Sequence, residues 1–103
     1  MPLGGDEFLV VMPGADVAIA GRRAEELREE IAETSIRFDG SEFSITATVG
    51  VSVFPVHGTT SNLAILAADR ALYVAKDAGG NRTGVADLTG PRLLHGDLRR
   101  ETE

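Results

Sequence analysis

The sequence predicts a small α/β or α+β domain in which helices pack on a sheet. Two observations predict it. One segment alternates apolar and polar residues with a period of two, and two others space their apolar residues as helices do, with glycine and proline breaks between the segments. The expected order is strand, helix, hairpin, strand, helix, strand, and 103 residues suit one domain.

The first expected strand covers residues 7–12, and Pro13 and Gly14 end it. Because it is short, apolar and rich in branched and aromatic residues, we expect it to be buried on both faces. Gly4 and Gly5 stand just before it and favour a tight turn, since glycine adopts positive φ freely.

The first expected helix begins after a cap at Asp16 and runs to about Glu33. One apolar stripe follows helical spacing: Val17, Ala20, Ala24, Leu27 and Ile31. The remaining charged residues are interpreted as a solvated face: Arg22, Arg23, Glu25, Glu26, Arg28, Glu29, Glu30 and Glu33.

A hairpin is expected over residues 36–43, because Asp39-Gly40 between two short β-type runs is a strong turn signal. Residues 44–54 then alternate cleanly, which predicts a strand that Pro55 ends.

The second long helix is expected over residues 61–78, capped by Ser61, and its few polar residues predict that it is mostly buried. Gly79-Gly80 would end it, and a short strand would follow over residues 82–85. From Asp87 onward the chain is polar and aperiodic, which predicts a domain over residues 1–86 and a mobile tail over residues 87–103.

Composition excludes several classes of protein. A net charge of −6 opposes binding to nucleic acid, and no apolar run is long enough to span a membrane. The absence of cysteine removes disulfides and thiolate metal sites and is compatible with the cytoplasm. His57 and His95 do not form a cluster in the sequence, which disfavours a transition-metal site.

The segment Gly4-Gly5-Asp6-Glu7 carries the sharpest chemical signal. A turn without Cβ atoms lets a phosphate approach the backbone, and carboxylates are the oxygen ligands that Mg²⁺ prefers. Strand neighbours point to opposite faces, so Asp6 and Glu7 can share a metal only if the turn extends through Asp6. The competing interpretation is a surface hairpin with solvated acids.

Residues 4–8 are identified as the GGDEF signature of the diguanylate cyclase family. The resemblance continues through residues 9–14, 23–28 and 44–52 and through the late helix at residues 68–76, and it covers about residues 3–85. It implies an α+β fold, a partial ferredoxin-like palm like that of nucleotide cyclases, with an antiparallel-containing sheet and two long helices.

The resemblance also implies a reaction. Two such domains meet head to head, each holding one GTP, and two Mg²⁺ ions assist formation of cyclic di-GMP and pyrophosphate. It assigns Asp6 and Glu7 to metal binding and catalysis, Gly4 and Gly5 to the phosphates, and Lys76 to the outer phosphates. Without the resemblance, Lys76 would be interpreted as a solvated lysine near a helix C-terminus.

The chain departs from the family pattern. Gly80 stands where an arginine is usual, with Arg82 two residues on, and Pro2 stands where another arginine is usual. The family's first strand, with a further metal-binding aspartate, and the guanine-reading helix after it would precede Met1. We therefore expect a truncated domain in which strand 8–12 either pairs directly with strand 45–54 or joins an intertwined homodimer.

Two functional hypotheses follow. In the first, the chain is the catalytic half of a diguanylate cyclase domain, inactive alone because part of the constellation is missing. In the second, it is a non-catalytic GGDEF remnant that serves as a dimerisation or interaction module. Gly80 and the missing strand favour the second.

Overall fold

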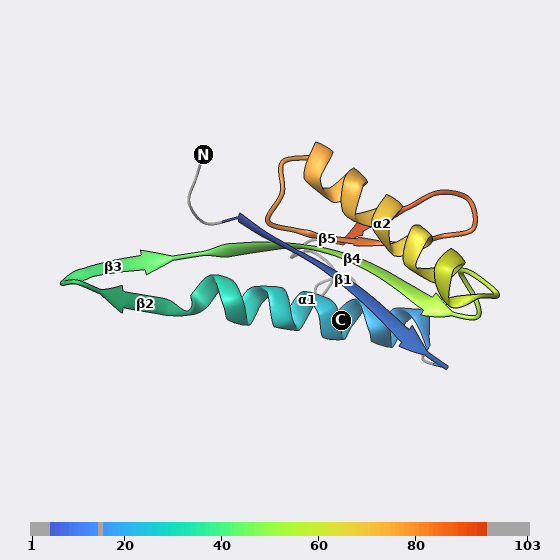
Figure 1. Cartoon of the computed structure of the whole chain (residues 1–103), viewed down its shortest axis with the longest axis horizontal. Helices are drawn as coiled ribbons and strands as arrows, with labels where there is room; N and C mark the ends of the chain where they lie inside the picture. The colour runs from blue at the N-terminus through green and yellow to red at the C-terminus, as the bar shows by residue number, and fades with distance from the viewer. Residues whose placement is uncertain (1–4, 15, 95–103) are drawn as a thin grey trace, which may run out of the picture.

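The computed structural model describes residues 5–14 and 16–94. A mixed sheet in the order β1-β4-β5-β6 is covered by helix α1 (Val17–Glu33) on one face and helix α2 (Ser61–Asp77) on the other (Figure 1). The predicted α+β class is confirmed. Two features of the sequence position the helices: a capping Asp16 before α1 and small side chains on the buried face of both helices.

Strand β4 (Thr46–Phe54) is the centre of the fold. The predicted alternation is confirmed: Ala47, Val49, Val51 and Val53 form the core under α1. The opposite face of β4 meets α2 through Gly50, where an added Cβ would lie 2.2 Å from the Ala68 carbonyl oxygen. The helix backbone therefore packs directly on the strand.

Strand β1 (Gly5–Pro13) runs parallel to β4 along its whole length, with Asp6 opposite Ala47 and Glu7 opposite Thr48. Direct pairing was one of the two expected arrangements, and it is the one observed. The prediction that this strand is buried on both faces is wrong, because Phe8 and Leu9 are 39% and 43% exposed. β1 is an edge strand, and α1 lies mainly over β4 and β5.

The hairpin of β2 (Ser35–Phe38) and β3 (Ser41–Ser44) extends beyond the end of the main sheet (Figure 1). Asp39 and Gly40 both adopt positive φ, as the sequence signal predicts. Its residues are exposed on both faces.

Helix α2 is less buried than predicted. Its buried stripe consists of Ala64, Ala68, Ala71, Leu72 and Ala75. Leu63, Ile65 and Leu66 are about half exposed, because the helix backbone approaches the sheet so closely that four of the five buried side chains are alanine. The N-cap is Thr60 rather than Ser61, and its Oγ1 accepts a hydrogen bond from the Leu63 amide at 3.1 Å.

Strand β5 (Thr83–Val85) pairs in parallel with β4, and strand β6 (Arg92–Leu94) pairs antiparallel with β5. Residues 92–94, which the sequence predicts to lie in a mobile tail, form strand β6, and three residues are too few to show a period in the sequence. The expected tail beyond residue 94, with His95, lies outside the described residues. No helix among the described residues is both long and apolar enough to cross a membrane.

Candidate functional site

The candidate site lies where the start of strand β1 meets the last turn of helix α2. Nζ of Lys76 is 3.0 Å from Oε2 of Glu7, and both side chains are about half exposed, at 47% and 50%. Lys76 is the one basic residue in the last turn of α2, where the helix dipole favours a positive charge. Glu7 and Lys76, which the sequence singled out separately, are therefore in direct contact.

Asp6 and Glu7 point to opposite faces of the sheet. Asp6 is in register with Ala47, on the α1 side, whereas Glu7 is in register with Thr48, on the α2 side. Since β1 is already a regular strand at Gly5, the turn does not extend through Asp6, and the condition for the two carboxylates to share one ion is not met.

The described residues contain no cluster of three or more side chains suited to a metal ion. Glu7 still fits the usual mode of Mg²⁺, which takes one or two carboxylates and completes its coordination with substrate phosphates and water. Gly5 is the first residue of β1, and Gly4 lies outside the described residues, as does Pro2.

The turn after α2 is a Schellman motif. The Gly80 amide donates to the Ala75 carbonyl and the Gly79 amide to the Lys76 carbonyl, each at 3.0 Å. Gly79, Gly80 and Asn81 all have positive φ. The predicted helix stop is confirmed, and the turn is bonded to the backbone of Lys76 itself.

Gly80 has little room for a side chain. Its φ is +73°, and an added Cβ would lie 3.1 Å from the Thr48 hydroxyl. Arg82 folds back over this turn, and its Nε donates to the Gly80 carbonyl at 2.9 Å. An arginine side chain is therefore present at the turn, although residues two apart do not share a direction in regular structure.

Glu25 and Arg28 form a buried ion pair on α1. Their side chains are 8% and 12% exposed, so the interpretation as a solvated face is wrong for this pair. Arg28 forms two hydrogen bonds to Glu25, at 2.9 and 2.6 Å, and donates from Nη1 to the Asn81 side-chain oxygen at 2.7 Å. The hydrogen bond to Glu25 raises the pKa of Arg28, against the effect of burial.

A signal for this pair was present in the sequence. Ala20, Gly21 and Ala24 are small residues on one helical face, and residues 25 and 28 continue that face. Leu27, assigned to the apolar stripe, is instead 45% exposed.

His57 lies at the other end of the sheet, beside a hollow of about 220 Å³ that Arg70 and Asp87 also line. Its Nδ1 accepts a hydrogen bond from the Val53 amide at 2.8 Å. Burial lowers the pKa of His57, and the charge of Asp87 acts in the opposite direction. Through this hydrogen bond the His57 imidazole ties the loop after β4 back to the end of the strand.

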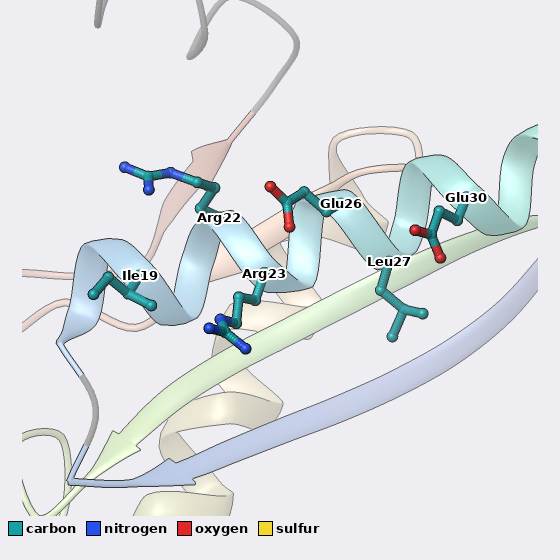
Figure 2. Close-up of a pocket in the computed structure, with 6 residues that line it drawn as sticks. All are labelled: Ile19, Arg22, Arg23, Glu26, Leu27 and Glu30. Atoms are coloured by element: carbon teal, nitrogen blue, oxygen red, sulfur yellow. The ribbon is translucent and has the colours of Figure 1, made fainter.

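A shallow hollow of about 510 Å³ lies along α1 (Figure 2). All six residues that line it come from this helix: Ile19, Arg22, Arg23, Glu26, Leu27 and Glu30. In Figure 2 the side chains of Arg22 and Glu26 point away from those of Arg23 and Leu27. The hollow is on the opposite face of the sheet from Lys76, so it is separate from the candidate site.

Comparisons with known proteins agree with the motif. The family model described as "Diguanylate cyclase, GGDEF domain" matches residues 1–82. Diguanylate cyclase A of Treponema denticola is 32% identical over 86% of this chain and 24% of its own length. Diguanylate cyclase TpbB of Pseudomonas aeruginosa is 36% identical over 89% of the chain and 21% of its own length.

An uncharacterized signaling protein of Caulobacter vibrioides is 42% identical over 75% of the chain and 10% of its own length. The chain thus spans between a tenth and a quarter of these three relatives. No solved structure matches it.

Proposed function

The chain belongs to the GGDEF domain family, and from that premise we propose that it forms part of a domain that condenses two molecules of GTP into cyclic di-GMP. The observation that carries the proposal is the contact between Glu7 and Lys76. It brings a carboxylate suited to a divalent cation beside a cation suited to a phosphate.

Charge explains why both groups are needed. The chain carries a net charge of −6, so a triphosphate is repelled unless cations offset it locally. Lys76 supplies one, and Mg²⁺ held by Glu7 and the phosphates supplies another. In the proposed complex the Lys76 ammonium turns from Glu7 toward the outer phosphates, and Glu7 turns to the ion.

Mg²⁺ bound there would neutralise phosphate charge in the transfer step. The family's two-ion mechanism needs further ligands, because the described residues place Asp6 and Glu7 on opposite faces. We therefore expect the 103-residue chain by itself to form little cyclic di-GMP.

Condensing two nucleotides requires two domains, so we propose a homodimer in which the Glu7–Lys76 ion pairs of two copies face each other. Light scattering at rising protein concentration with Mg²⁺ and GTP tests this, and a strict monomer would contradict it. Because the substrate is GTP, the proposed site of action is the cytoplasm.

The alternative is a non-catalytic interaction module. One observation favours it: Gly80, where the family usually has an arginine, has positive φ and little room for a side chain. The position of Arg82 disfavours this alternative, because its side chain folds back over the same turn and places a guanidinium there.

A chimera separates the two functions. Residues 5–85 of this chain replace the matching segment of Treponema denticola diguanylate cyclase A, and cyclic di-GMP is measured by mass spectrometry. Catalysis predicts product in the chimera and a loss of about a hundredfold or more with Glu7→Gln. A folded, dimeric chimera without product would support the interaction module.

A further inference from the structure

We propose that Glu25 and Arg28 are positioning residues: from α1 they anchor the turn that ends α2, and so hold Lys76 beside Glu7. The inference rests on the proposed function only for what Lys76 binds. The anchoring itself depends only on contacts among the described residues.

The anchor begins with a buried ion pair on an otherwise small-residue helix face. Arg28 bonds both oxygens of Glu25, and Glu25 Oε1 also accepts a hydrogen bond from the Thr83 hydroxyl at 2.8 Å. Every buried polar side-chain atom among the described residues has a hydrogen-bond partner, so this cluster leaves no buried group unsatisfied.

Arg28 then reaches across to the turn. Its Nη1 donates to the Asn81 side-chain oxygen at 2.7 Å and to the Asn81 carbonyl at 3.3 Å. Asn81 has φ of 53°, an uncommon conformation that these contacts help to maintain. The guanidinium thus holds one residue of the turn by both its side chain and its backbone.

The turn is fixed from the sheet as well. The Asn81 amide donates to the Thr48 hydroxyl at 2.9 Å, and Thr48 is the register partner of Glu7. On the other side, the turn is bonded to the Lys76 carbonyl through Gly79. A continuous set of contacts therefore links α1 to both members of the Glu7–Lys76 pair.

Stability alone is a poor reason for such a pair. A buried ion pair loses much of its attraction to desolvation, and apolar residues of similar volume often serve the core equally well. The half-exposed Glu7–Lys76 pair contributes little by itself. The position of Lys76 must therefore come from its backbone, which the Arg28 contacts fix.

Lys76 is the only lysine in the sequence, which permits a specific assay. A carbodiimide joins a carboxylate and an amine that touch, with loss of one water, so the Glu7–Lys76 cross-link reports their contact by mass spectrometry without any nucleotide. Glu7→Gln removes this cross-link and identifies it.

Two variants loosen the anchor in different ways. Asn81→Gly removes the side-chain acceptor and keeps a residue that tolerates positive φ. The double variant Glu25→Gln, Arg28→Met removes both charges together, so no buried charge is left unpaired. Arg37→Gln is the matched control, because it breaks an exposed Arg–Glu pair in the distant hairpin.

The positioning role predicts that the rate of cross-linking falls about fivefold or more in both anchor variants and is unchanged in Arg37→Gln, while circular dichroism shows a folded chain. Rates within about twofold of the wild type in both variants, or no Glu7–Lys76 cross-link in the wild-type chain, would overturn the inference.

A second measurement separates this inference from the proposed function. Calorimetry with magnesium tripolyphosphate is expected to show about tenfold weaker binding in both anchor variants. If the wild-type chain does not bind the probe but the cross-link falls as expected, the positioning role stands and the proposed function fails. If the variants bind it as tightly as the wild-type chain does, the positioning role is wrong.

Discussion

Replacing Gly50 with alanine probes the closest approach in the fold. The added Cβ would lie 2.2 Å from the Ala68 carbonyl oxygen and 2.7 Å from the Leu72 amide nitrogen. Both atoms belong to the backbone of α2, so no side-chain rotation relieves the clash. The helix must retreat from β4 by about 1 Å to restore normal contact distances.

The expected loss of stability in Gly50→Ala follows from the rigidity of the α2 backbone. Overpacking a core costs about 1–3 kcal/mol, and a clash with helix backbone belongs at the upper end, about 3 kcal/mol. For a domain of this size each kcal/mol corresponds to about 4–8 °C, so Tm falls by about 12 °C or more.

Thermal unfolding followed by circular dichroism measures the effect, with Gly14→Ala as the control. Gly14, unlike Gly50, has positive φ, at +68°, but an added Cβ meets nothing within 4 Å, so that variant loses only about 1–2 kcal/mol to backbone strain. A Gly50→Ala variant as stable as Gly14→Ala would refute the direct packing of α2 on β4.

Three further changes test other parts of the structure. Asp16→Ala removes the cap that accepts from two amides at the start of α1 and is expected to cost about 1 kcal/mol in urea unfolding. Ser52→Ala removes the buried hydroxyl that donates to the Ala64 carbonyl at 2.6 Å, with an expected loss of about 1 kcal/mol by the same assay. Burial lowers the pKa of His57 below its ordinary 6.5, so the unfolded chain binds the proton more readily. Its contribution to stability is present above pH 6.5 and is lost as the pH falls toward the lower folded pKa. His57→Gln, whose side-chain oxygen can still accept from the Val53 amide, should weaken this pH dependence of the urea midpoint, and an unchanged dependence would contradict the assignment.

Local chemistry made several elements predictable from the sequence. The Asp39-Gly40 turn, the Asp16 cap and the Gly79-Gly80 stop depend on what each residue's own backbone and side chain can do, and all three are where the sequence predicts them. The alternation of β4 was equally clear, because its valines pack under α1 whereas Gly50 and Ser52 on the other face meet α2.

Burial was predicted less well, because it depends on neighbours distant in the chain. Phe8 and Leu9 are apolar residues of an edge strand, and Leu63 and Leu66 are half exposed on α2, whose close approach to the sheet favours alanine on its buried side. Residue type alone does not reveal either effect.

The candidate site was predictable in its parts but not in its arrangement. The motif identified Glu7 and Lys76, residues far apart in the chain, and only the packing of α2 against β1 brings them together. Glu25 and Arg28 were missed because charge was taken as a sign of exposure, although their helical position places them on the small-residue face.

The proposed function requires Glu7 and Lys76 to bind a triphosphate together with a divalent cation. Calorimetric titration of GTP into the chain, with and without Mg²⁺, tests it most directly when the wild type is compared with Lys76→Met. We expect GTP binding that requires Mg²⁺ and weakens about tenfold or more in the Lys76→Met variant. Binding that is indifferent to Mg²⁺, or equally tight without the lysine, would contradict it.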